Sequence, residues 1–153
     1  MIIATRMKKF LAGAALLMIA LPSVAQELMM VRSPRSFPEA MLTLQTAIGE
    51  YGYTLSRVQR VDIGLTGSGF TTDKYRVVFF GKLEEIRMLS ERYPQLIPYL
   101  PLRMTIFAEE EETIVVMEDP ARMANLVADP EVAFLFRRWH NDASSILDEL
   151  RKE

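Results

Sequence analysis

The chain has 153 residues, half of them apolar, with 18 basic residues, 20 acidic residues, one histidine and no cysteine. This length supports one domain and excludes a large multidomain enzyme. The lack of cysteine excludes disulfides, thiol catalysis, cysteine-bound zinc, iron–sulfur clusters and c-type haem, and a single histidine excludes a histidine-cluster metal site. The net charge of −2 argues against a nucleic-acid-binding protein, because such proteins usually carry a basic excess.

The first 25 residues have the pattern of a secretory signal peptide. Three basic residues precede an uncharged run, residues 10–21, which is followed by the small residues Ser23 and Ala25. We expect residues 1–25 to be cleaved after Ala25, and the mature domain, residues 26–153, to be periplasmic or secreted. Twelve apolar residues rise only about 18 Å as a helix, well short of the roughly 30 Å hydrocarbon core, so we expect no stable membrane span. After removal of residues 1–25 we expect no membrane association.

Cleavage also changes the charge. The leader holds three basic and no acidic residues, so the mature chain would carry 15 basic and 20 acidic residues, a net charge of −5. An exported protein without disulfides depends on its core for stability. The mature length is sufficient, since a chain of this size buries roughly two-thirds of its unfolded surface.

The mature chain opens with a predicted strand and helix. Leu28–Val31 is a short apolar run typical of a strand. A helix is predicted to begin at Ser36, which forms a capping box with Glu39, and to end before Gly52. Its apolar residues recur at spacings of three and four: Phe37, Met41, Leu44, Ile48 and Tyr51.

Two strands follow, with a glycine-rich segment between them. Residues 53–62 alternate, which places one set of side chains on a single face: Tyr53, Leu55, Arg57, Gln59 and Val61. The second strand is residues 75–80. The segment Gly64–Gly69 resembles a phosphate-binding loop, but a strand follows it rather than a helix, so we expect a flexible hairpin loop.

Residues 83–118 are predicted to form a helix, a connection and a hairpin. Residues 83–93 have helical periodicity. Three prolines in residues 94–101 predict a rigid extended connection. Residues 103–109 and 113–118 predict a hairpin around a turn of glutamates.

The C-terminal part, residues 121–152, is predicted to be helical and broken near Pro130. The apolar face of the longer piece is expected to consist of Val132, Phe136, Trp139, Ala143, Ile146 and Leu150.

This order predicts an α+β domain with a single antiparallel curved sheet in the order β-α-β-β-α-β-β-α and helices on one face. The strands at 75–80 and 113–118 are apolar on both faces. A sheet covered on one side only should alternate with polar residues. The second face must therefore be covered by a partner subunit, an apolar ligand or the C-terminal helix.

No catalytic residue, cofactor or metal site emerges. The glutamate run at residues 109–112 lacks the spaced ligands of a calcium loop, and we expect a solvated turn. His140 and its neighbour Asp142 point in different directions on a helix, so they predict no catalytic dyad. The methionines of the mature chain, apart from Met29 and Met30, are mostly expected to fill the core, since a methionine-only copper site would need a cluster that the sequence does not indicate.

Several segments of the second half resemble the domain of unknown function 302 family. They are Val77–Lys82, Tyr93–Gln95, Tyr99–Arg103 and Met117–Pro120, and the resemblance extends over residues 28–150. It implies a compact α+β fold with a curved sheet like that of the TATA-binding protein, and often a homodimer. It implies no biochemical activity.

The chain departs from this family at two positions. Many members have cysteines where Phe80 and Leu102 stand, so any thiol, metal or redox role of those relatives does not apply here. Arg103 matches the family pattern. It is expected either to pair with a glutamate or to bind an anion.

We consider three hypotheses for the function. The leading one is an exported, non-enzymatic homodimeric binding domain that associates through its apolar sheet face. The alternative is a periplasmic carrier of a small apolar or amphipathic ligand, with a pocket between the open sheet face and the terminal helix, lined by Tyr53, Arg57, Tyr75 and Arg103. The third is a hydrolytic enzyme that uses carboxylates and Arg103.

Overall fold

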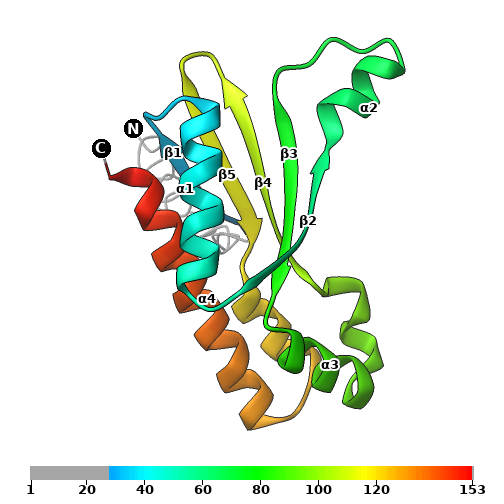
Figure 1. Ribbon diagram of the computed structural model, residues 1–153. Coiled ribbons are helices and arrows are strands. Elements are labelled where there is room, and N and C mark those ends of the chain that lie inside the picture. Colours follow the sequence, from blue (N-terminus) through cyan, green and yellow to red (C-terminus); the bar gives the residue numbers. More distant parts are fainter. Residues whose placement is uncertain (1–27, 153) are drawn as a thin grey trace, which may run out of the picture.

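The computed structural model describes residues 28–152, so the predicted leader lies outside the described residues. Five strands form one sheet in the order β1-β5-β4-β3-β2, and every neighbouring pair is antiparallel (Figure 1). The strands are β1 Leu28–Ser33, β2 Thr54–Arg60, β3 Tyr75–Gly81, β4 Leu102–Glu109 and β5 Glu112–Glu118. The predicted single antiparallel α+β sheet is confirmed.

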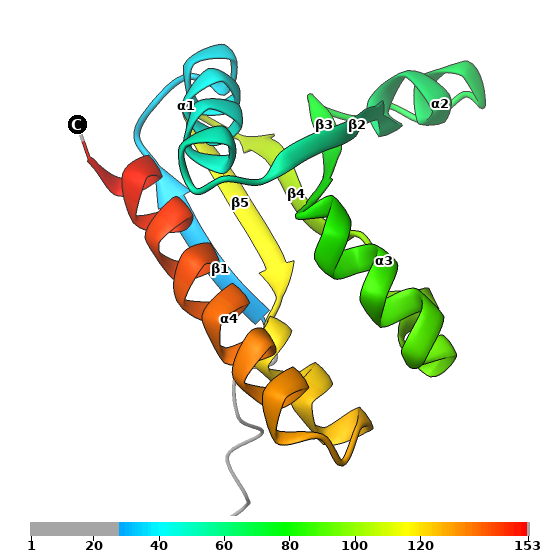
Figure 2. The same cartoon turned by 60° about the horizontal axis from the view of Figure 1, so that its bottom comes forward.

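The two longest helices pack together over one face of the sheet. Figures 1 and 2 show α1 and α4 side by side, with α4 running along β1. The α-helices are α1 Phe37–Glu50, α2 Val61–Gly67, α3 Leu83–Arg92 and α4 Pro130–Arg151. Two 3-10 helices, η1 Pro94–Tyr99 and η2 Pro120–Leu126, flank the sheet end at which β4 begins and β5 ends.

Helix α1 begins and ends as the sequence predicts. The backbone N–H of Ser36 donates to a Glu39 carboxylate oxygen at 3.1 Å. Gly52 follows the helix with a φ of +76°, a conformation that other residues adopt only with strain. The helix buries one stripe against the sheet and α4: Ala40, Leu44, Ala47 and Ile48.

Helix α4 is fixed at both ends. Its cap residue Asp129 accepts hydrogen bonds from two backbone N–H groups of the first turn, at 2.9 and 3.3 Å. At the other end, Arg35 donates to the carbonyls of Glu149 and Leu150, each at 3.2 Å. The predicted apolar face is confirmed, since Val132, Phe136, Trp139, Ala143, Ile146 and Leu150 are all buried.

Two segments differ from the sequence prediction. The glycine-rich segment begins inside helix α2, and only the residues after Gly67 form a loop. An ion pair between Asp62 and Arg76 joins α2 to β3 and supports this helix despite the low helix propensity of glycine. Residues 94–99 form the 3-10 helix η1 instead of an extended connection. Proline permits this because its fixed φ suits the first turn of a helix.

The edge strand β2 is irregular. Its pairing with β3 shifts register between Leu55 and Arg57, which marks a β-bulge. Ser56, between them, uses its hydroxyl to donate to the carbonyl of Phe79 at 3.1 Å. The bulge ends the strict alternation of side chains along this strand.

Candidate functional site

One face of the sheet, which we name the open face, lies opposite α1 and α4. A row of side chains crosses all five strands here in register: Met30, Val116, Thr105, Val77 and Gln59. The next positions along the strands add Phe79, Phe107 and Tyr75. All of these side chains except Gln59 are apolar or only weakly polar, and none of the eight is fully buried. An apolar sheet face that remains accessible to solvent is typical of an interaction surface.

The structure brings three of the four predicted site residues to this face. Arg57 and Arg103 are the two cross-strand neighbours of Phe79, one on each side. Tyr75 lies opposite Phe107, and their rings meet edge to face at 6.5 Å between centroids. Arg103 also forms an ion pair with Glu118 at 3.3 Å, which is one of the two roles predicted for it.

Tyr53 lies on the other, helix-covered side. Its ring packs against the buried Phe80 at 5.5 Å between centroids. The β-bulge explains why Tyr53 and Arg57 lie on different sides of the sheet. Leu55 pairs with Phe80 whereas Arg57 pairs with Phe79, so Leu55 and Arg57 face opposite sides. Helix α4 lies on the side of Tyr53, so the four residues do not line one pocket between the open face and that helix.

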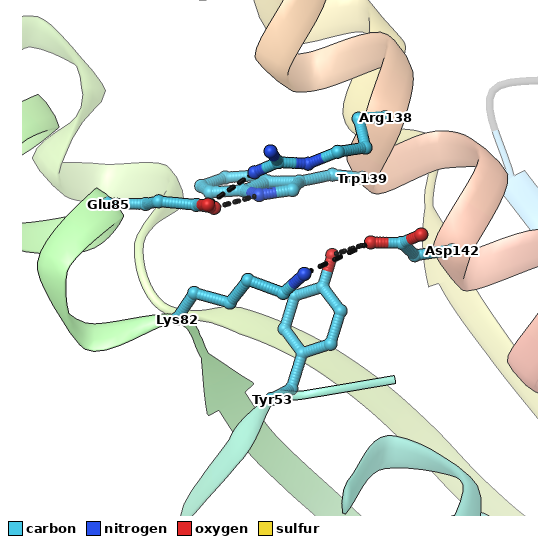
Figure 3. A network of polar contacts seen from close by, with 6 residues as sticks. All are labelled: Tyr53, Lys82, Glu85, Arg138, Trp139 and Asp142. Atoms are coloured by element: carbon cyan, nitrogen blue, oxygen red, sulfur yellow. Dashed lines mark hydrogen bonds and ion pairs between the residues drawn. The ribbon is translucent and has the colours of Figure 1, made fainter. Parts of the chain in front are cut away.

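Tyr53 instead belongs to a network of polar contacts beneath α4 (Figure 3). Its hydroxyl donates to Asp142 at 2.8 Å. Lys82 lies with its ammonium 3.5 Å from the same carboxylate and 4.6 Å from the centre of the Tyr53 ring. Burial, and then the hydrogen bond to Asp142, raise the pKa of the Tyr53 hydroxyl, so it stays protonated and acts as a donor.

The second half of the network joins α4 to α3. The indole N–H of Trp139 donates to Glu85 at 2.7 Å, and Arg138 forms an ion pair with the same carboxylate. Trp139 is fully buried. Both carboxylates of the network are thus bound by donors from neighbouring elements, and the arrangement serves to hold α4 in place.

A cavity of about 800 Å³, which we name the end cavity, opens where the open face meets η1 and η2. Most of its lining is apolar: Leu28, Met30, Tyr99, Leu102, Met117, Pro120, Met123 and Leu126. Its polar residues are Arg103, Glu118, Asp119, Arg122 and Asn125. Arg103 is among the residues predicted from the sequence, but the cavity itself was not predicted, because its walls come from segments far apart in the chain.

One wall of the end cavity is held by the single histidine. Asp119 accepts a hydrogen bond from the N–H of Ala121 at 2.8 Å at the start of η2. The ring Nδ1 of His140 lies 2.7 Å from the same Asp119 oxygen and so joins η2 to α4. The sequence predicted no catalytic dyad at His140, and it did not indicate Asp119 as its partner, which lies 21 positions away.

Within residues 28–152, no three histidine, aspartate or glutamate side chains form a group suited to a metal ion. In the predicted glutamate turn, Glu109 and Glu112 both bind Arg32. In the same range, none of the helices is long and apolar enough to cross a membrane.

The fold and its faces define a class of protein: an α+β domain with a five-stranded antiparallel sheet, helices on one face and an apolar open face. The chain belongs to the family Domain of unknown function DUF302, whose model matches residues 29–150. The crystal structure of an uncharacterized conserved DUF302 protein from Bacillus stearothermophilus is similar, with a TM-score of 0.74 and 16% identity, over 83% of this chain and 100% of that chain. No curated protein matches this chain. The predicted family is thus confirmed.

The two positions at which the family resemblance implies cysteines lie side by side. Phe80 on β3 and Leu102 on β4 are cross-strand partners, with exposed fractions of 1% and 5%. Apolar side chains fill both positions in this chain, where they extend the core.

Proposed function

We propose that the mature protein is an exported, non-enzymatic binding domain that pairs with a second copy of itself through the open face. The single observation behind this proposal is the apolar row that crosses the sheet on the side opposite the helices. Five strands about 4.8 Å apart and about six residues long give a patch of roughly 500 Å². The largest apolar patch on a single chain is commonly of this size and is often functional.

The residues around the patch favour a symmetric pair. Charged residues border it on several sides, with Arg32 on β1, Arg57 on β2, and Arg103 beside Glu118 on β4 and β5. A twofold pair places each patch against the same patch of its copy, and the ion pairs that Arg32 and Arg103 form with glutamates of their own chain reduce the repulsion between like charges at the border. Two such patches would bury about 1,000 Å² in total, at the lower limit for a specific interface.

The test is the mass of the mature protein in solution, measured by light scattering after gel filtration. We expect a dimer. Thr105→Lys places a charge at the centre of the row and should give a monomer, with an unchanged circular dichroism spectrum as evidence of folding. The matched control is Leu42→Lys on the outer side of α1, where the exposed fraction is 68%, and it should stay dimeric. A monomeric wild-type protein, or a Thr105→Lys dimer, would overturn the proposal.

A second candidate function, a carrier of a small amphipathic ligand, is favoured by the end cavity. Its volume of about 800 Å³ lies within the range of roughly 300–1,000 Å³ that ligand pockets occupy. Native mass spectrometry of protein purified from the periplasm tests this candidate. A carrier should show a reproducible added mass that is lost when the cavity is filled by Leu126→Trp. An added mass that persists in this variant would contradict the assignment of the cavity.

A further inference from the structure

We propose that the end cavity binds a monocarboxylate with an apolar chain, and that the guanidinium of Arg103 binds its carboxylate. The inference rests on the carrier candidate and deepens it by naming the ligand class and the anchoring residue. Three observations carry it: the apolar walls of the cavity, the donors that Arg103 still has available, and the balance of charges at the cavity.

The walls of the end cavity suit an alkyl chain. Leu28, Met30 and Leu126 line it with exposed fractions of 49%, 48% and 42%. A bound chain would remove this apolar surface from water, which is the main source of affinity for such ligands. Met30, Met117 and Met123 share the lining, and unbranched thioether side chains adapt their shape to different occupants. The cavity therefore favours a flexible apolar chain over a rigid polar ligand.

Arg103 supplies the polar contact. A guanidinium carries five N–H donors in a planar fork that matches the two oxygens of a carboxylate. Among the described residues, Arg103 donates to Glu118 alone, at 3.3 Å, and about half of each side chain or more is exposed. An exposed ion pair of this kind contributes little stability, so a ligand carboxylate can join or replace Glu118 at low cost.

The charges around the cavity disfavour a ligand with more than one negative charge. Arg103 and Arg122 line it together with Glu118 and Asp119, so the basic and acidic residues are equal in number. Asp119 is already bound to His140 and to a backbone N–H. A doubly charged phosphate would meet two carboxylates in a chain with an acidic excess, whereas a neutral alcohol would leave the arginine fork unused. A monocarboxylate carries only one negative charge and can also accept hydrogen bonds from the guanidinium.

Titration calorimetry on the mature protein tests the inference with decanoate and 1-decanol, which share a chain and differ in the head group. We expect decanoate to bind at least about ten-fold more tightly, the effect of one charge-assisted contact. Arg103→Gln should abolish this preference and leave the affinity for 1-decanol unchanged. Arg57→Gln is the matched control, because Arg57 is the other cross-strand neighbour of Phe79 and does not line the cavity, so it should keep the preference.

Three results would overturn the inference: equal affinity for the two probes, a preference that survives Arg103→Gln, or tighter binding of decyl phosphate than of decanoate. The first and third leave the carrier candidate intact, because a chain would still bind. Binding of neither probe, together with no retained ligand in native mass spectrometry, would refute the carrier itself. Arg103 borders the open face as well as lining the end cavity, so light scattering is repeated on Arg103→Gln, and an unchanged oligomeric state separates ligand binding from dimer formation.

Discussion

Replacing Tyr53 by phenylalanine tests whether this residue stabilises the fold rather than binding a ligand. The change removes one hydroxyl from a side chain with an exposed fraction of 5% and keeps the ring against Phe80. The lost hydrogen bond of 2.8 Å goes to the carboxylate of Asp142, and bonds to charged groups contribute about 1.5–3 kcal/mol. Because Lys82 remains 3.5 Å from that carboxylate, we expect the lower half of this range, about 1.5–2 kcal/mol.

The assay is urea unfolding of the mature protein followed by the fluorescence of Trp139, its only tryptophan, which is fully buried between α4 and the core. Asp142→Ala and the double variant complete a mutant cycle. The two changes should be non-additive by at least about 1 kcal/mol, because each removes the same hydrogen bond. Binding of decanoate serves as the second readout.

A stabilising role of the hydrogen bond between Tyr53 and Asp142 is refuted if Tyr53→Phe changes the free energy of unfolding by less than about 0.5 kcal/mol, or if the effects of the two changes are additive within that limit. A variant of unchanged stability that no longer binds decanoate would restore the role in ligand binding that the sequence suggested for Tyr53.

Three further predictions concern stability. Above about pH 10 the unfolded chain releases the Tyr53 proton, whereas the folded chain retains it because the pKa of Tyr53 is raised. The stability of the wild type should therefore fall above this pH, and that of Tyr53→Phe should fall less. Urea unfolding midpoints measured below and above this pH check the prediction. The Tyr93 hydroxyl, and then backbone N–H groups, lower the pKa of Asp129, so its contribution is present above about pH 4 and lost as the pH falls below it. The stability gap between wild type and Asp129→Asn should therefore shrink in acid, and a constant gap from neutral to acidic pH would contradict this. Gly52→Ala should lower the free energy of unfolding by about 1–2 kcal/mol, because alanine is strained at a φ of +76°. An unchanged midpoint of thermal unfolding would refute this explanation.

The elements that the sequence predicts well are those whose periodicity is unbroken. The buried face of α4 follows from apolar residues every three or four positions along 22 residues. The strands at 75–80 and 113–118 are apolar on both faces, and the structure places the second apolar set of each strand on the open face. Their register then placed Val77 and Val116 in one row, on either side of Thr105.

The site residues were harder to predict because they depend on contacts distant in sequence. Alternation along residues 53–62 put Tyr53 and Arg57 on one face, and a single inserted residue at the bulge reversed that. Likewise, the end cavity needs β1, β4, β5, η1 and η2 together, and no local pattern brings them to one place. The partner of His140 could not be predicted for the same reason.

The irregular edge of the sheet has a consequence for how copies of this protein can associate. A regular, flat edge strand offers a row of free backbone groups to which another strand can be added, and repeated addition leads to fibres. On β2 the bulge between Leu55 and Arg57 interrupts that row, and Arg57 and Arg60 bring like charges to it. Extension at this edge is therefore discouraged. In the proposed dimer, one pairing through the broad apolar face covers the open face of both copies.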